Sequence, residues 1–311
     1  MTTGSSARLT LTAAVTAFTV IVAACGSDTS SDESSDTEVV LRIGAIPDQE
    51  PERLQRTYDL LSEYLEAELD GVDVEYVPVT EYSAAVTGFA VGDFDLAWFG
   101  ALTGVQARNE VDGAAALAQR DIDETFTSVY IARADSGIEP VDSVDGLAQL
   151  EGRSFTFGSE SSTSGRLMPQ SFLTEAGIDV NEDFAGEPGF SGSHDATIEL
   201  VNAGTFEAGA VSSEVWDSRV AEGAVDTDEI IEVFRTPPYY NYHWVGQPDL
   251  DTRFGEGFTT RVLDALMGLD PNDSGDAAIL ELFSAEGFIL TEDANYDAIE
   301  AVARDVGLVR E

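Results

Sequence analysis

The spacing of apolar residues changes from one segment to the next along the first hundred positions. Residues 39–47 form a short apolar run that ends in a proline-containing loop, which predicts a strand. In residues 51–69 leucines and a tyrosine recur every three or four positions, which predicts an amphipathic helix. Residues 72–79 alternate as a strand, 82–91 predict a second helix and 94–99 a third strand. This βαβαβ order predicts a sheet with parallel strands and covering helices.

The same alternation returns later in the chain. Residues 153–157 predict a strand, and 166–176 predict a helix that Gly177 ends. The other predicted elements are helices at 196–203, 213–221, 259–267 and 296–306 and strands at 208–211, 230–234 and 242–245. Two α/β units on one chain predict two lobes, with a ligand bound beyond the carboxyl ends of strands.

The N-terminal segment has the composition of an export signal. Residues 1–24 contain one arginine, an apolar stretch and small residues before Cys25, and the stretch is short for a membrane span. The sequence VAAC at 22–25 resembles a bacterial lipobox, in which the cysteine is lipidated; an uncleaved anchor is the alternative. Residues 25–38 are polar and acidic, which predicts a flexible tether. Cys25 is the only cysteine, so no disulfide can form within the chain.

The charge is strongly negative and spread along the whole chain. Fifty-nine acidic residues stand against 15 basic ones, all of them arginine. Such a surface excludes nucleic acid and anionic lipid as partners. Its even distribution favours adaptation to a salt-rich habitat over one acidic binding site. Because about 0.1 M salt is needed to bring the screening length down to about 10 Å, we expect the melting temperature to rise with NaCl.

One segment stands out by its hydroxyl groups. Residues 158–169 read GSESSTSGRLMP, between a predicted strand and a predicted helix. The five hydroxyl residues are Ser159, Ser161, Ser162, Thr163 and Ser164. At the start of a helix their O–H groups and unpaired backbone N–H groups can converge on an anion. The alternative is an ordinary helix cap, although a cap needs only one such residue.

Three more residues have side chains that suit the same pocket. His194 lies in the Gly/Ser turn 190–195 before a helix, and a purely structural hydrogen-bonding role is its alternative. Tyr82 begins a predicted helix and can donate a phenolic hydrogen bond. Trp98 ends a predicted strand and can form a pocket wall. Packing in the core is the alternative for both aromatic residues.

Arg120 is one of few cations in this acidic chain. A guanidinium group can hold a tetrahedral oxyanion through two parallel hydrogen bonds. The alternative is an ion pair with Asp121 or Asp123 on the surface.

The chain has little that indicates catalysis. No G-x-S-x-G segment is present, and Ser162 with His194 and Asp195 makes a triad only by position. Two histidines and one cysteine cannot supply a zinc site, and no D-x-[DN]-x-[DN]-G calcium loop occurs. We therefore predict a protein that is not an enzyme and that needs no cofactor or metal.

Together these segments resemble the periplasmic phosphate/phosphonate-type solute-binding proteins of ABC importers, from about Leu41 to the C-terminus. The motifs that carry the resemblance are IGAIP at 43–47, TEY at 80–82, GDFDLAWFG at 92–100, ADSGI at 134–138, STSG at 162–165 and SGSHD at 191–195. Within that family the chain resembles most the branch named for selenate binding. This narrower likeness is carried by residues 118–123, 157–169 and 235–239.

The resemblance implies roles for individual residues. The anion-holding positions correspond to Tyr82, Ser162, Thr163, Ser164 and His194.

Other implied positions lie around the rest of the ligand. An acidic residue that meets the ligand's ammonium group in phosphonate binders corresponds to Glu214. Phe126 stands where those proteins tend to have a tyrosine, and we include Ser128 nearby as a candidate contact. The second acidic residue falls in the aromatic stretch 239–243. These departures weaken the ammonium pocket, and Arg120 favours a bare, doubly charged oxyanion.

The resemblance also implies the architecture and the function. We expect a type II-like periplasmic-binding-protein fold of class α/β, with two hinge crossings and a mixed sheet flanked by helices in each lobe. Lobe one would comprise 39–134 plus 240–311, and lobe two 137–238. The expected function is that of a lipid-anchored substrate-binding protein on the outer face of the cytoplasmic membrane. It would capture a selenate-like or phosphate-like oxyanion and deliver it to an ABC permease and its ATPase. A phosphonate binder of the same fold and a surface sensor are the alternatives.

Overall fold

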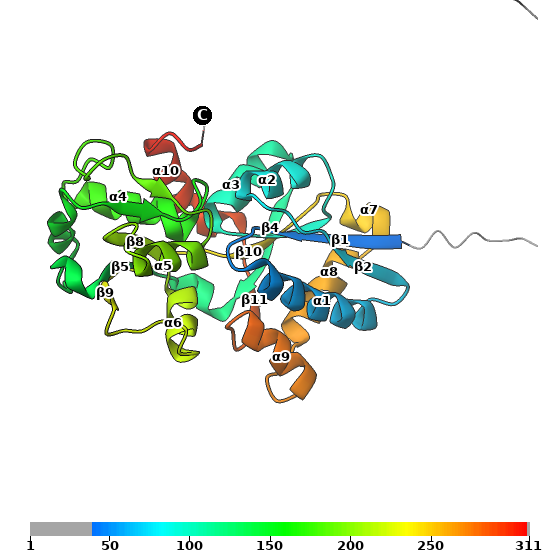
Figure 1. Ribbon diagram of the computed structural model, residues 1–311. Helices are drawn as coiled ribbons and strands as arrows, with labels where there is room; N and C mark the ends of the chain where they lie inside the picture. Colours follow the sequence, from blue (N-terminus) through cyan, green and yellow to red (C-terminus); the bar gives the residue numbers. More distant parts are fainter. Residues whose placement is uncertain (1–38, 310–311) are drawn as a thin grey trace, which may run out of the picture. The chain divides into compact units, whose positions relative to one another are not determined.

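The computed structural model describes residues 39–309. The predicted signal segment 1–24 and tether 25–38, with Cys25, lie outside the described residues. Residues 39–309 contain two sheets with helices on both faces, as the predicted α/β two-lobed fold requires (Figure 1). We call the six-stranded sheet with its helices the first lobe and the five-stranded sheet with its helices the second lobe. No helix between residues 39 and 309 is long and apolar enough to cross a membrane.

The first lobe is built on a mixed sheet with the strand order β11-β4-β10-β3-β1-β2. Its strands are β1 (Val39–Ala45), β2 (Val72–Tyr76), β3 (Leu96–Phe99), β4 (Ala115–Arg120), β10 (His243–Gly246) and β11 (Phe288–Leu290). β1 pairs in parallel with β2 and β3, whereas β10 runs antiparallel between β3 and β4. The C-terminal part of the chain therefore returns to complete the sheet that the N-terminal part begins.

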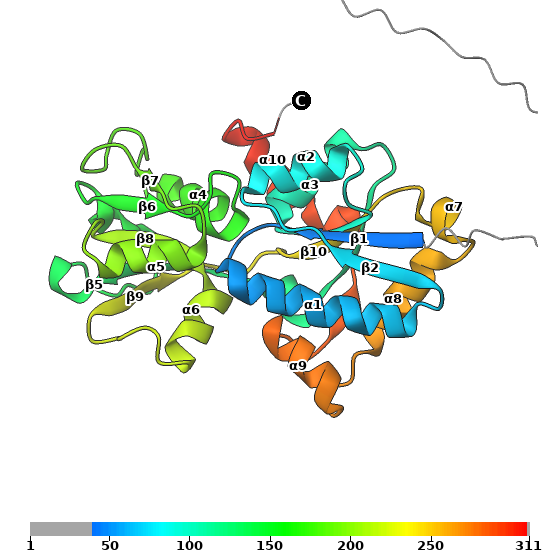
Figure 2. The same ribbon diagram turned by 45° about the vertical axis from the view of Figure 1, so that its right-hand side comes forward.

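Helices cover both faces of this sheet (Figure 2). They are α1 (Pro51–Glu68), α2 (Tyr82–Ala90), α3 (Ala101–Glu110), α7 (Leu250–Phe254), α8 (Phe258–Gly268), α9 (Ser274–Leu282) and α10 (Asp297–Asp305). α1 packs on α8 and α9, while α3 packs on α2 and α10. Because both faces are covered, the central strand β3 is apolar and buried at every position instead of alternating.

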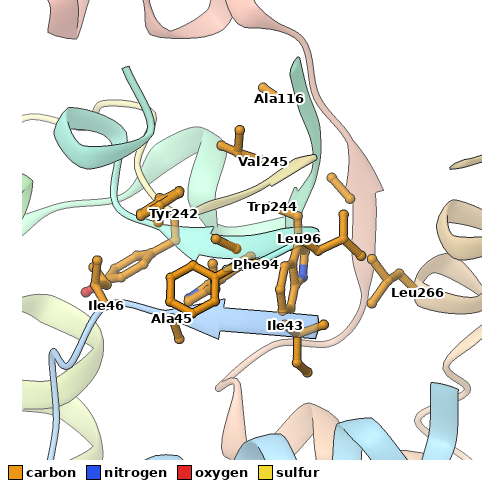
Figure 3. Close-up of a cluster of buried hydrophobic side chains, with 14 of the residues drawn as sticks. Ile43, Ala45, Ile46, Phe94, Leu96, Ala116, Tyr242, Trp244, Val245 and Leu266 are labelled. Carbon is orange, nitrogen blue, oxygen red and sulfur yellow. The ribbon is translucent and has the colours of Figure 1, made fainter. Parts of the chain in front are cut away.

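The core of the first lobe lies around β1 and β3 (Figure 3). Ile43 is fully buried and Phe94 lies against the strand, in contact with its backbone. A Cβ atom at Gly44 would come within 2.6 Å of the Phe94 ring, so glycine is needed here for the ring to pack on β1. This packing fixes the carboxyl end of β1, where the chain turns into the site.

The second lobe has the strand order β7-β6-β8-β5-β9. Its strands are β5 (Ser128–Arg133), β6 (Phe155–Phe157), β7 (Gly189–Phe190), β8 (Ala208–Ser212) and β9 (Ile230–Arg235). Its helices are α4 (Met168–Glu175), α5 (His194–Asn202) and α6 (Ser213–Ala221), with the short helical turns η2 (Ala134–Ser136), η3 (Val144–Leu150) and η4 (Thr163–Leu167). α5 packs on β8 and β5, and α4 packs on η3.

The first crossing between the sheets differs from its predicted position. β5 pairs with β8 and β9 in the second sheet, although we had placed residues up to 134 in lobe one. The pairing partners of β5 are about 80 to 100 positions away, so its apolar pattern alone could not assign it to a sheet. The chain crosses after the turn η1 (Asp121–Thr125) and again between β9 and β10. At these crossings Phe126 and Tyr239 pair through two backbone hydrogen bonds of 3.0 and 2.9 Å.

Candidate functional site

Three hydroxyl groups of the 158–169 segment are buried where β6 leads into η4. The Ser162 Oγ accepts a hydrogen bond from the Gly165 N–H at 2.9 Å, so this residue is a cap. The Thr163 Oγ1 accepts from the Leu102 N–H, at the start of α3 in the first lobe, at 2.8 Å. The Ser164 Oγ lies 3.4 Å from the His194 Nε2. One segment thus supplies a cap, a contact between lobes and a side chain beside His194.

The other two hydroxyl residues are less buried. Ser159 and Ser161 are half-buried, and the Ser159 Oγ accepts from the Ser161 N–H at 3.3 Å. Ser161 lines a different surface hollow, next to α2 and α3. The five hydroxyl residues that look equivalent in the sequence are therefore not equivalent in the fold.

His194 is the first residue of α5 and is 1% exposed. Its Nδ1 accepts a hydrogen bond from the Ser212 N–H at 3.2 Å, which places the ring proton on Nε2. The Nε2 lies 3.4 Å from both the Ser164 Oγ and the Tyr242 hydroxyl. Burial lowers the pKa of His194 to about 4, so the ring is neutral at pH 7. It is therefore a neutral N–H donor with a fixed direction.

Tyr82 supplies a second buried donor. It begins α2, is 2% exposed, and its hydroxyl has no hydrogen-bond partner of normal geometry within residues 39–309. Burial and then the charge of Asp48 raise the pKa of Tyr82 well above its usual value, against a contact of the phenol with the Ser162 side chain, so the phenol keeps its proton. A buried hydroxyl without a partner is costly, and a ligand oxygen in this place would remove that cost.

Asp48 is a buried carboxyl that the sequence analysis missed. It lies just beyond β1 and is 4% exposed. Burial raises its pKa to about 7, while a hydrogen bond with the Tyr242 hydroxyl opposes the rise. The only signal in the sequence is its place after the first strand of an α/β unit, where ligand-binding loops lie. Tyr242 falls in the aromatic stretch 239–243 and was not singled out either.

Arg120 is the last residue of β4. It forms an ion pair with Asp123, which was the predicted alternative to ligand binding, but the pair is buried and does not lie on the surface. Its Nε and Nη2 donate to the two Asp123 carboxylate oxygens at 2.7 and 2.9 Å, and its Nη1 donates to the Phe283 carbonyl at 2.7 Å. The side chain is 3% exposed, and the guanidinium carbon lies 4.8 Å from the centre of the Tyr242 ring. Two of its five N–H groups are left by these bonds.

A small cavity lies beside Asp48 and Arg120. The space open to the centre of a water-sized molecule is about 20 Å³. Aromatic rings form much of its wall, and Trp98 stacks on Tyr242 with ring centres 5.8 Å apart. Phe283 meets Trp98 edge-on at 5.5 Å. Trp98 therefore forms part of the wall of this cavity. The rings leave room for only a small group.

Glu214 closes this cavity on one side. Its Oε1 accepts a hydrogen bond from the Ser284 hydroxyl in the first lobe at 2.6 Å, and burial raises the pKa of Glu214 against the opposing charge of Arg120. Glu214 also lines a larger hollow of about 1000 Å³ between α1, α6 and α9. Phe126 lines that hollow rather than the small cavity.

Ser128 lies behind the hydroxyl turn. Its Oγ donates to the Ser164 carbonyl at 2.8 Å, because a carbonyl can only accept. The Tyr239 hydroxyl must then donate to the Ser128 Oγ, at 2.6 Å. With its proton committed in this way, Ser128 holds Ser164 in position.

Contacts between the lobes surround the site. The Asp48 carbonyl accepts from the His194 N–H at 3.0 Å. At the rim, Asp195 accepts from the Glu50 N–H at 2.9 Å and from the Arg219 Nε at 2.7 Å. These contacts bring residues from both lobes within hydrogen-bonding distance.

The arrangement offers several hydrogen-bond donors and no nucleophile paired with a base. His194, Tyr82 and Ser164 supply neutral donors, which suit an anion without adding charge. Across residues 39–309 no three His, Cys, Asp or Glu side chains form a group that could hold a metal ion. The geometry is suited to binding a small anion.

Comparison with known proteins identifies relatives over most of the chain. Residues 43–296 match the family described as ABC transporter, phosphonate, periplasmic substrate-binding protein. A probable ABC transporter phosphite binding protein, PhnD1 of Prochlorococcus marinus (strain MIT 9301), is 44% identical over 271 residues, which cover 87% of this chain and 91% of PhnD1. A phosphate-import protein, PhnD of Mycolicibacterium smegmatis, is 26% identical and the match covers 86% of each chain.

Solved structures agree with this. The structure of P. marinus PhnD1 in complex with methylphosphonate has a TM-score of 0.84 at 44% identity, covering 87% of this chain and 99% of PhnD1. A binding protein component of a phosphonate transporter from Pseudomonas aeruginosa has a TM-score of 0.74 at 16% identity, covering 85% of each chain. At that identity the second likeness supports the fold alone.

Proposed function

This chain belongs to the family of periplasmic substrate-binding proteins of phosphonate ABC transporters, and we propose that it binds a small phosphorus oxyanion such as methylphosphonate or phosphite. The prediction of a binding protein that is not an enzyme is confirmed by this membership. The narrower likeness to the selenate-binding branch stays a prediction, and the phosphonate alternative fits the relatives better.

One observation carries the choice of ligand size. The His194 Nε2 lies 3.4 Å from both the Ser164 Oγ and the Tyr242 hydroxyl, and Tyr242 and Asp48 also line the aromatic cavity of about 20 Å³. A tetrahedral oxyanion among the donors would direct its fourth substituent towards that cavity. A hydrogen atom or a methyl group suits this space, whereas an aminoethyl chain would need more room than the cavity offers.

The proposal includes delivery of the ligand to an ABC permease and its ATPase. We further propose that the exported chain is anchored by a lipid on Cys25, as the VAAC segment predicts. Metabolic labelling with a fatty acid, with Cys25→Ala as the control, tests the anchor.

Calorimetric titration in molar NaCl tests the ligand. We expect methylphosphonate and phosphite to bind more tightly than 2-aminoethylphosphonate, sulfate and selenate. Ser164→Ala should weaken binding about ten- to hundredfold, because a hydrogen bond to a charged group contributes about 1.5–3 kcal/mol. Ser161→Ala is the matched control and should leave the affinity unchanged. Tightest binding of selenate would instead support the original prediction, and equal effects of the two variants would contradict the site.

A further inference from the structure

Asp48 is held inside the site by both lobes. Its N–H donates to the Ile46 carbonyl at 3.0 Å, and its carbonyl accepts from the His194 N–H across the lobe interface at 3.0 Å. Figure 3 shows Ile46 at this end of β1, two positions before Asp48. The Asp48 carboxyl lines the small cavity and contacts the Tyr242 hydroxyl, which also lies near the His194 Nε2. It thus lines the cavity beside a tyrosine whose hydroxyl lies near the donor nitrogen of His194.

The groups that face Asp48 do not neutralise its charge. Burial and the carboxyls of Glu214 and Asp195 raise the free energy of the ionised form, whereas the Tyr242 hydroxyl and the charge of Arg120 lower it. That guanidinium is bound in turn to Asp123 through two hydrogen bonds. The remaining ionisable neighbours are the phenols of Tyr58, Tyr76, Tyr82 and Tyr242, which stay protonated because their pKa values are raised.

An ionised Asp48 beside a bound anion would be a close pair of like charges in a buried site. Among residues 39–309 Asp48 makes no ion pair that would offset the repulsion. One proton between the two groups removes it and forms a short hydrogen bond, whichever partner carries the proton.

We propose that Asp48 shares one proton with the bound oxyanion, so that the site prefers anions that carry a proton of their own to anions that carry none. This inference rests on the proposed function, because it concerns a phosphorus oxyanion among these donors. A phosphonate or phosphite monoanion brings a P–OH group and donates it to Asp48. Sulfate and selenate carry no proton near neutral pH, so the shared proton must come from Asp48 itself or, where Asp48 is ionised, from solvent.

The proposal has a clear signature at alkaline pH. Where Asp48 and the free ligand have both lost their protons, each binding event must take up one proton from solvent. The affinity for methylphosphonate should then fall about tenfold for each pH unit. His194 does not contribute, because its pKa of about 4 keeps it neutral in this range.

The experiment is calorimetric titration of the protein with methylphosphonate, sulfate and selenate between about pH 7 and 9.5, in buffers of different ionisation enthalpy. The buffers report proton uptake directly, which should approach one per ligand for the wild-type protein at the alkaline end. Asp48→Asn supplies an amide donor that needs no proton. In this variant the uptake and the pH slope should disappear, and the preference for methylphosphonate over sulfate should shrink at least tenfold.

Two controls separate Asp48 from its neighbours. Glu214→Gln removes the other carboxyl at the cavity, and Glu50→Gln removes an exposed carboxylate at the rim; both should keep the proton uptake. Uptake near zero in the wild-type protein overturns the proposal even if Asp48→Asn does not fold. Uptake that survives in Asp48→Asn or disappears in Glu214→Gln overturns it too. Failure of every phosphorus oxyanion to bind at any pH would instead refute the proposed function.

Discussion

The two histidines of this chain lie in two regions that use the same side chain in opposite ways. His194, at the lobe interface, accepts a hydrogen bond from the Ser212 N–H at Nδ1. Its Nε2–H is directed towards Ser164 and Tyr242. His243, in the core of the first lobe, uses both nitrogens: Nδ1 donates to the Asn241 carbonyl and Nε2 accepts from Arg108 at 2.7 Å.

Burial does not distinguish the two rings. Both are almost fully buried, at 1% and 0% exposure, and burial lowers both pKa values. The His243 ring also stacks on Tyr296 at 3.8 Å, so all of its surface is occupied. What separates a binding histidine from a structural one here is the number of ring nitrogens that the fold has already paired.

The largest difference should appear in stability. His243→Ala removes a fully packed ring and leaves Arg108 and the Asn241 carbonyl without their partner. We expect a loss of about 3–5 kcal/mol in the free energy of unfolding, measured by urea denaturation. His194→Gln should cost much less. Equal losses in the two variants would mean that His194 is also mainly structural.

Ligand affinity should depend more on His194 than on His243. His194→Gln misplaces the directed Nε2–H donor, and we expect the affinity for methylphosphonate to fall about ten- to hundredfold. His243→Gln, measured under conditions in which it is folded, should bind almost as the wild-type protein does. Titration calorimetry checks both, and an unaffected His194→Gln would remove His194 from the site.

Low pH should lower the free energy of unfolding through both histidines, because burial lowers both pKa values. The pKa of His194 falls from 6.5 to about 4 on folding, so between these values the unfolded chain binds a proton that the folded chain does not. This ring therefore leaves the free energy of unfolding unchanged above about pH 6.5 and lowers it by about 1.4 kcal/mol per pH unit as the pH falls from there to about 4. His194→Gln should lessen the slope of stability against pH by one proton. An unchanged slope would show that the ring is not buried as described.

Added salt should have the smallest effect on the difference in stability between the His194 and His243 variants. NaCl should raise the melting temperature of the wild-type protein, because it screens 59 acidic residues against 15 basic ones. Both histidines are buried, so the difference in stability between their variants should change by less than about 0.5 kcal/mol from low to molar NaCl. A melting temperature that does not respond to salt would contradict the predicted adaptation to a salt-rich habitat.

The sequence predicted most regular elements of the fold because their patterns are local. The predicted helix at 213–221 is α6, and the predicted helix at 51–69 is α1 to within one residue. Seven strands and α-helices were not predicted, and most of them are short or alanine- and glycine-rich and show little periodicity: α3, α7, α9, β4, β5, β7 and β11. The sheet to which β5 belongs depends on partners remote in sequence, which no local pattern contains.

For the site, the sequence predicted residue types better than roles. That Ser162 and Thr163 hold the anion stays a prediction: their hydroxyl oxygens accept hydrogen bonds from Gly165 and Leu102, and each O–H proton can still be donated. Arg120 was weighed as a surface ion pair or a ligand contact, and it is a buried ion pair. Asp48 was missed because a single acidic residue among 59 carries no signal until the fold buries it.

The hydrogen bonds behind the hydroxyl turn have a mechanical consequence. Ser128 joins the Ser164 carbonyl to the Tyr239 hydroxyl, and Tyr239 pairs with Phe126 where the chain passes twice between the sheets. Two hydrogen bonds therefore connect Ser164 to Tyr239, in the segment where the chain passes between the sheets. The two connecting segments are bonded to each other at Phe126 and Tyr239, so a rotation of one lobe against the other would have to bend both segments together.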